Sequence, residues 1–176
     1  MPSADPLTGL NVSISQSTTS PPTIIATVKN NNSHLVTIAP YRTPFDSLVL
    51  EQGILSVVPG GGADDSDSSS SNSSANSSAN KPLDYPTIML KRSWPPAADL
   101  LVTLGPGESR TAEIVIRHPV PLRQLGSSAT VKLSGQWMSV WRRAKEEIGA
   151  ADWDDVSNPD EFSGQYESNS LEIMLA

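Results

Sequence analysis

Residues 101–116, LVTLGPGESRTAEIVI, decide the fold class of this chain. Their centre, Gly105-Pro106-Gly107, predicts a tight turn, because proline fixes φ at about −65° at one corner and glycine accepts a positive φ at another. After the turn, Ala112 and Ile114 fall on one side of an alternating run and Glu113 falls on the other. Alternation of period two is typical of a strand with one buried face. The stretch therefore predicts two strands joined by a turn.

The same pattern recurs along most of the chain. Short alternating runs bounded by proline, glycine, asparagine or serine predict further strands. The opening stretch contains two of the predicted strands, residues 100–104 and the strand after the turn. The further predicted strands are residues 10–15, 23–30, 34–39, 54–58, 86–93, 129–137 and 165–175. About 7 to 9 short strands with almost no helix predict an all-β fold, an antiparallel immunoglobulin-like β-sandwich. A closed barrel is the alternative architecture.

Residues 129–137 form the clearest strand after the opening stretch, with Val131, Leu133 and Trp137 on its inward face. Gly135 interrupts the pattern, which predicts a bulge or a close backbone approach. If the strand continues through the following serine, Trp141 shares the face of Trp137. Trp141 would then lie at the rim of the core.

Two connections stand out from the strands. Residues 41–46, YRTPFD, mix aromatic residues with a proline, as loops that cross between sheets often do. Residues 142–148 predict one or two helical turns that end at Gly149, and residues 152–161 predict an acidic loop.

The composition changes completely at residues 60–80, a run of Gly, Asp, Ser, Asn and Ala. No side chain there can enter a core, so the run predicts a disordered loop. The pieces on either side are each too short to fold alone. We therefore predict a flexible N-terminus at residues 1–9 and one β-sandwich domain at 10–176 that the loop interrupts, with an interdomain linker as the alternative.

Charge and composition exclude several classes of protein. The formal net charge of −7 disfavours nucleic acid and anionic membranes as partners. There is no cysteine, so disulfides, thiolate nucleophiles and cysteine zinc sites are excluded. No secretory signal is recognised, which predicts a cytoplasmic protein, or a secreted one if the N-terminus was trimmed. Four N-glycosylation patterns begin at Asn11, Asn31, Asn72 and Asn76, in a chain rich enough in Asn and Ser for them to arise by chance.

No constellation in the sequence amounts to a reaction. His34 and His118 both lie at predicted strand ends, which is typical of exposed histidines, and no metalloprotease, nucleotide-binding or nucleophile-elbow motif is present. The acidic groups at 64–67, 146–147 and 152–155 lie in predicted loops or on a solvated turn and lack the calcium-loop spacing. The sequence therefore predicts no catalytic residue, no metal site and no cofactor.

The tryptophans give the best candidates for an interaction surface. Trp141 is followed directly by Arg142 and Arg143, and Trp and Arg are favoured at interaction hot spots. Trp94 and Trp153 lie beside predicted loops. Two interpretations stay open: a structural one with Trp141 at the rim of the core, and a functional one with these five residues as an exposed binding surface.

Several segments together resemble a known family. They are VSIS at 12–15, TIIATVKNNNSHLVTI at 23–38, TPFD at 43–46 and VTLGPGES at 102–109. In this order they resemble the non-catalytic β-sandwich pro-segment of fungal deuterolysin-type metalloproteases. The resemblance implies a fungal origin and a role in assisting the folding of a protease or holding it inactive. No zinc helix or protease domain is present here, so no functional residue carries over.

We therefore predict a non-enzymatic module that binds a protein partner, with protease inhibition or chaperoning in trans as the specific form. The alternative from another class is a small hydrolase or carbohydrate-binding protein that uses Asp or Glu near a tryptophan. A purely structural domain is the third possibility.

Overall fold

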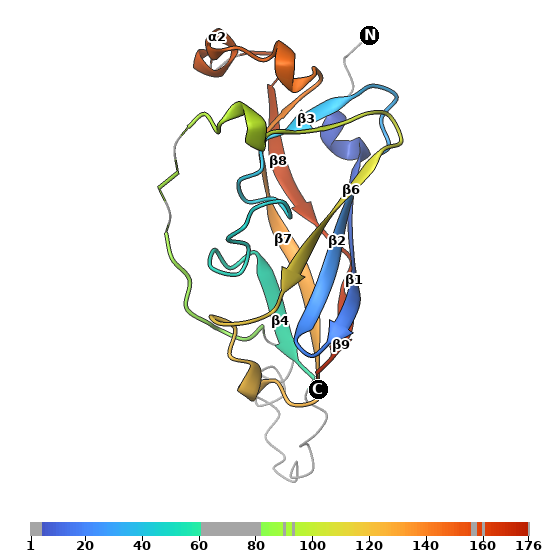
Figure 1. Cartoon of the computed structure of the whole chain (residues 1–176), viewed down its shortest axis with the longest axis vertical. Coiled ribbons are helices and arrows are strands. Elements are labelled where there is room, and N and C mark those ends of the chain that lie inside the picture. Colours follow the sequence, from blue (N-terminus) through green and yellow to red (C-terminus); the bar gives the residue numbers. More distant parts are fainter. Residues whose placement is uncertain are drawn as a thin grey trace, which may run out of the picture.

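The chain folds into an antiparallel β-sandwich in which a three-stranded sheet faces a six-stranded one (Figure 1). The computed structural model describes residues 5–60, 82–89, 91–92, 94–155, 158–159 and 161–175. The predicted loop at 60–80, apart from Gly60, and the acceptor patterns at Asn72 and Asn76 lie outside these residues.

The smaller sheet has the order β1-β2-β6. Its strands are β1 (Leu10–Thr19), β2 (Pro22–Asn30) and β6 (Ser109–Val115). β1 and β2 form a hairpin, and β6 follows the predicted Gly-Pro-Gly turn, in which Gly107 has a φ of 78°. That positive φ confirms the turn chemistry read from the opening stretch.

The larger sheet is built around one long strand, β7 (Ser128–Trp141). Along one edge β7 pairs first with β4 (Leu55–Pro59) and then with β3 (Val36–Ile38), which also pairs with β5 (Val102–Leu104). Along the other edge it pairs with β9 (Leu171–Met174) and then with β8 (Glu161–Glu167). At each edge of β7, two strands therefore pair with it one after the other along its length.

A single hydrophobic core lies between the sheets. It takes Ile24 and Val28 from β2, Ile114 from β6, and Val131 and Trp137 from β7, all buried. The alternation read from the sequence places these side chains correctly.

In the described part of the chain, helix is confined to short turns. Short 3-10 turns span Pro6–Gly9, Ala98–Leu100, Leu122–Gln124 and Lys145–Glu147, and the one α-helix among the described residues is α2 (Ala150–Asp154). The helical turns predicted at 142–148 reduce to one 3-10 turn, and the predicted acidic loop begins inside α2. No helix in the described part of the chain is long and apolar enough to cross a membrane.

Two strand predictions differ from the structure. The predicted strand at 86–93 is wrong, because residues 86–89 and 91–92 are in no strand. Residues 82–89 instead run beside β4, where Leu83 N donates to Val57 O at 2.6 Å. Pro82 and Pro86 lack the N–H groups that a continuous ladder needs. The predicted strand at 165–175 is two strands, because the hydroxyl of buried Ser168 accepts from Leu133 N and interrupts the ladder between β8 and β9.

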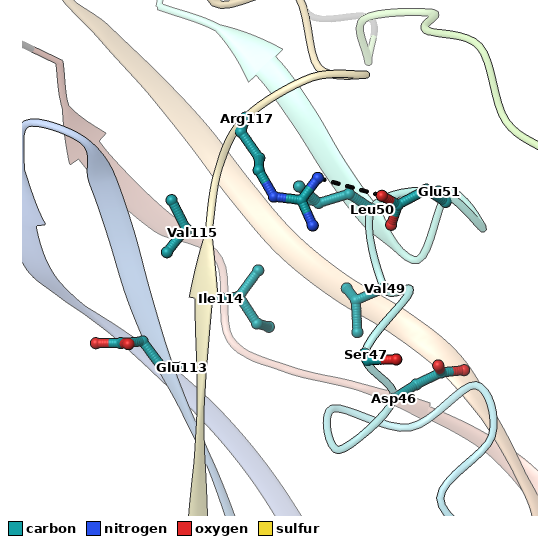
Figure 2. A pocket seen from close by; sticks show the side chains of 9 residues that line it. All are labelled: Asp46, Ser47, Val49, Leu50, Glu51, Glu113, Ile114, Val115 and Arg117. Carbon is teal, nitrogen blue, oxygen red and sulfur yellow. Dashed lines mark hydrogen bonds and ion pairs between the residues drawn. The ribbon is translucent and has the colours of Figure 1, made fainter.

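The outer edge of β6 faces the turns at residues 46–51 across a hollow of about 190 Å³ (Figure 2). Figure 2 shows Val49 and Ile114 directed toward each other from the two sides, with the pair formed by Glu51 and Arg117 at one end. We call this space the β6 hollow.

Candidate functional site

A β-bulge in β7 decides where its two tryptophans point. Trp137 is opposite Gly164 on β8, but Val140 is opposite Phe162, so β7 contains one extra residue between these positions. Trp137 and Val140 therefore both enter the core, and Trp141 faces the other side of the sheet. The prediction that Trp137 and Trp141 share a face is wrong, because a bulge reverses the alternation beyond it.

Trp141 is nevertheless buried, with 0% of its surface exposed, because other aromatic rings cover it. Trp153 of α2 packs on it with the ring centroids 5.2 Å apart, and Trp94 packs edge-on against Trp153 at 5.3 Å. Tyr41 follows at 6.4 Å from Trp94. We call these four residues the aromatic cluster. Such tilted and edge-to-face pairs contribute about 1 kcal/mol each beyond the area they bury.

Arginine side chains lie at both ends of the aromatic cluster. The Arg92 guanidinium carbon is 4.5 Å from the centroid of Tyr41, and that of Arg143 is 5.3 Å from Trp141. Arg143 also pairs with Asp152 at 3.0 Å, which ties α2 to the end of β7. The Asp152 carboxylate accepts from Gly149 N as well, and these contacts lower the pKa of Asp152.

The five candidate surface residues therefore have different positions. Trp94, Trp141 and Trp153 come together in the aromatic cluster, but the functional interpretation expected Trp141 to be exposed, and it is buried. Trp141 cannot contact a partner, because Trp153 and Arg143 cover it. Arg142 and Arg143 are half-buried, with Arg142 over the ring of Phe162 at 5.1 Å. Trp94 is the exposed member, with 44% of its surface accessible.

Beside Trp94 the surface is hollowed to a volume of about 320 Å³. We call this the Trp94 hollow; its lining residues are Tyr41, Arg42, Gln52, Arg92, Trp94 and Met138. A second hollow of about 280 Å³ shares Tyr41 and Arg92 with it and contains Asp99 and Leu100. Tyr41 and Arg92 thus separate two adjacent hollows.

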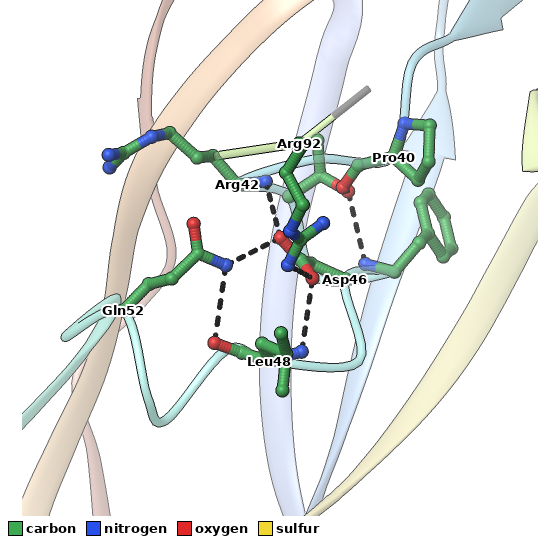
Figure 3. Close-up of polar contacts among 8 residues, drawn as sticks. Pro40, Arg42, Asp46, Leu48, Gln52 and Arg92 are labelled. Carbon is green, nitrogen blue, oxygen red and sulfur yellow. Dashed lines mark hydrogen bonds and ion pairs between the residues drawn. The ribbon is translucent and has the colours of Figure 1, made fainter. Parts of the chain in front are cut away.

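The carboxylate of Asp46 holds the floor of this region together (Figure 3). Its side chain is 1% exposed and accepts four hydrogen bonds, from Arg42 N at 2.8 Å, Leu48 N at 3.0 Å, Gln52 Nε2 at 2.6 Å and an Arg92 nitrogen at 2.7 Å. Burial alone would raise the pKa of Asp46, but these hydrogen bonds outweigh it, and the pKa is lowered. Asp46 is therefore a charged carboxylate with its hydrogen-bonding capacity satisfied.

A family model described as an immunoglobulin-like domain matches residues 9–175. The chain belongs to the immunoglobulin-like domain family. The match confirms the predicted fold class. No curated protein matches the chain.

One residue of this immunoglobulin-like domain has a strained backbone. Arg42 has a φ of 68°, the one positive φ of a residue other than glycine in the described part of the chain. Its N–H donates to Asp46, and its carbonyl accepts from Tyr166 Oη at 3.0 Å. A side chain at Gly135 would meet the Arg42 carbonyl at 2.4 Å, so the glycine leaves room for this turn to pack on β7. The predicted close backbone approach at Gly135 is confirmed.

Strain of this kind persists only where the surroundings enforce it, and it is concentrated at functional sites. The arrangement directs the exposed Arg42 side chain to the Trp94 hollow. Burial and the nearby Asp46 raise the pKa of Tyr166, which keeps its hydroxyl a hydrogen-bond donor to Arg42 over the physiological range.

Neither histidine lines the Trp94 hollow. His34 Nδ1 lies 3.1 Å from the carbonyl of Leu35, and His118 lines a small exposed hollow with Ile88. Among the described residues no group of three or more His, Asp or Glu could hold a metal ion.

Sequence reasoning found the tryptophans of the site but missed its polar half: Arg42, Asp46, Gln52 and Arg92. The available signal was the TPFD segment, since Thr-Pro followed by an acidic residue favours a turn in which the side chain bonds to nearby backbone. The contact between Asp46 and Arg92 spans a long loop, and no local pattern predicts it.

Proposed function

We propose that this immunoglobulin-like domain is a non-catalytic module that binds a protein partner through the Trp94 hollow. The observation that carries the proposal is the state of Trp94, which is exposed over 44% of its surface yet packed against Trp153 and Tyr41. An exposed aromatic side chain that is already ordered loses little entropy on binding. Immunoglobulin-like sandwiches are typically non-catalytic, which agrees with such a role.

The charges of the hollow indicate the chemistry of the partner. The charge of Arg92 is balanced by Asp46, whereas Arg42 forms no ion pair with another described residue. Within a chain of net charge −7, the Trp94 hollow is therefore a local positive site. An Asp or Glu side chain of the partner would pair with the Arg42 guanidinium beside Trp94.

The specific form of the proposal is inhibition or chaperoning of a protease in trans, and it is supported by the resemblance to deuterolysin pro-segments. A hydrolase is not proposed, because the six described residues that line the Trp94 hollow include no carboxylate to act as acid or base.

A displayed random-peptide library, selected against the whole chain, tests the proposal. We expect enriched peptides to carry an acidic residue and to be lost when selection is repeated on Arg42→Ala. A parallel selection on Met174→Ala, an exposed residue of β9, is the matched control and should return the same peptides. Enrichment unaffected by Arg42→Ala would refute the hollow as the binding site.

Inhibition or chaperoning of a protease in trans is tested by a separate assay. The chain is added in excess to a purified deuterolysin-type protease, and both hydrolysis and recovery of activity after denaturation are measured. Unchanged hydrolysis and unchanged recovery would exclude the inhibitor and chaperone roles while leaving the binding module itself intact.

A further inference from the structure

The outer edge of β6 differs from the other outer edge of its sheet, because nothing among the described residues pairs with it. β6 and β2 are antiparallel, with Ile116 N donating to Pro22 O and Asn30 N donating to Glu108 O. Even-numbered residues of β6 therefore turn their backbone groups toward β2, and odd-numbered residues turn theirs away. Ser109, Thr111, Glu113 and Val115 are the odd-numbered residues.

The opposite edge of the same sheet, on β1, is covered. Asn169 donates to Ile14 O and accepts from Ile14 N, as a neighbouring strand would. Gln16 makes the same paired contacts with Met174 of β9. In the larger sheet, residues 82–89 lie along the outer edge of β4 and donate to Val57 O. Side chains and a strap thus protect these edges against pairing, a common device in β proteins.

The uncovered edge of β6 opens onto the β6 hollow (Figure 2). The side chains of Val49, Leu50 and Ile114 give the hollow an apolar floor. Its far wall is the segment at residues 46–51, so the space has a strand edge on one side and a turn on the other. The unpaired backbone groups of β6 face this space, and a single extended segment is the kind of occupant that completes such an edge.

A carboxylate at one end of the β6 hollow has unused hydrogen-bonding capacity. Glu51 Oε2 accepts from the Arg117 guanidinium at 3.2 Å, but Glu51 Oε1 is buried and has no partner. A buried carboxylate oxygen left unsatisfied costs free energy, and a donor that reached the Glu51 carboxylate would offset part of that cost. A lysine or arginine of the ligand would complete its hydrogen bonds, in keeping with the net charge of −7.

We propose that β6 is a strand-addition site for an extended peptide segment of a partner protein. The segment pairs with the backbone of the four odd-numbered residues, places an apolar side chain over the floor formed by Val49 and Ile114, and places a lysine or arginine two residues along, facing Glu51. A spacing of two residues puts both side chains on the same face of the added strand. The site is separate from the Trp94 hollow and does not depend on it.

The test uses soluble eight-residue peptides that alternate threonine and valine and carry Lys, Gln or Glu at one central position. Amide hydrogen exchange of the full chain is followed by NMR at increasing peptide concentration. We expect the lysine peptide to slow exchange at Thr111, Glu113 and Val115 at least tenfold, the glutamine peptide to act more weakly, and the glutamate peptide to have no effect.

Two variants distinguish backbone pairing from general adhesion. Thr111→Pro removes an outward N–H that the fold does not use, and proline is tolerated at such edge positions. Thr111→Val keeps that N–H and is the matched control. We expect Thr111→Pro to abolish protection, Thr111→Val to retain it, and Glu51→Gln to remove the preference for lysine.

Three results would overturn the proposal. The first is no protection of the odd-numbered amides by the lysine peptide, and the second is equal protection in Thr111→Pro and Thr111→Val. The third is protection that rises with protein concentration in the absence of peptide, which would make a second copy the occupant. Protection unchanged by Trp94→Ala is expected and keeps this site distinct from the proposed function.

Discussion

Arg92 donates to the buried carboxylate of Asp46 at 2.7 Å while its guanidinium lies over the ring of Tyr41 at 4.5 Å. One side chain thus joins the polar floor of the site to the aromatic cluster. Because Asp46 also binds the backbone of Arg42 and Leu48, it fixes the turn that presents Arg42. The surface around Trp94 is therefore held in place before any partner arrives.

Replacing Asp46 with Asn should destabilise the domain by about 3 kcal/mol, because an ion pair is broken at a buried position. The free energy of unfolding is measured by denaturant titration. Asp99→Asn, which changes an exposed carboxylate of the neighbouring hollow, is the control and should alter the stability by less than about 0.5 kcal/mol. Equal effects of the two substitutions would contradict the role given to Asp46.

The carboxylate of Asp46 also makes the stability of the domain depend on pH. The pKa of Asp46 is lower in the folded than in the unfolded chain. The contribution of Asp46 to the free energy of unfolding is therefore complete above the pKa of the unfolded chain, about 3.9. That contribution is lost as the pH falls further, through the folded pKa. We expect the stability difference between the native chain and Asp46→Asn to shrink as the pH is lowered below about 4. A constant difference down to the acid transition would argue against a charged Asp46.

Trp153→Ala should uncover Trp141 and free Trp94 without removing either. Loss of two ring contacts and of part of the cover over Trp141 should cost about 2 kcal/mol of unfolding free energy. Tryptophan fluorescence should shift to longer wavelength as water reaches Trp141. Trp153→Phe, which keeps an aromatic ring at the position, should show a smaller change in both measurements.

Gly135→Ala should disturb the Arg42 turn. The new methyl group would lie 2.4 Å from the Arg42 carbonyl and 2.5 Å from the Tyr166 hydroxyl, so the turn must move. We expect a loss of about 2 kcal/mol in unfolding free energy and changed NMR shifts at Arg42 and Tyr166. At Gly149 an added methyl group meets nothing closer than 3.9 Å, so Gly149→Ala is the control and should leave both unchanged.

Tyr85 offers a check on the strap formed by residues 82–89. Burial, with a smaller effect of Glu51, raises the pKa of Tyr85 to about 12. Spectrophotometric titration should therefore show a tyrosine that ionises near that pH and is absent from Tyr85→Phe. Glu51→Gln should lower the titration midpoint slightly. A midpoint near 10 in the folded chain would mean that the strap does not hold Tyr85 against β4.

The sequence predicts the sandwich well, because alternation and turn residues are local signals. The turn at Gly105-Pro106-Gly107 and the inward positions of Val131, Leu133 and Trp137 follow directly from them. Gly135 indicates a bulge or a close approach in this strand, but no local pattern places an extra residue between Trp137 and Val140, so alternation predicts the wrong face for Trp141. At residues 86–93 the error is the reverse. The run alternates as a strand does, but Pro86 has no N–H to donate to a ladder.

The candidate site was only half predictable for the same reason. Trp94, Trp141 and Trp153 could be picked out by residue type, although their contacts join residues 59 and 12 positions apart. The positive φ of Arg42 and the contact between Asp46 and Arg92 depend on tertiary packing. Such features become visible only when the fold is known.

The measurement that tests the central claim most directly is the affinity of a selected acidic peptide for four chains, determined by titration calorimetry. The four are the native chain, Trp94→Ala, Arg42→Ala and Met174→Ala. We predict that the first two substitutions each raise the Kd at least tenfold and that Met174→Ala changes it less than twofold. A Kd that is unchanged in both Trp94→Ala and Arg42→Ala would contradict the assignment of the Trp94 hollow as the binding site.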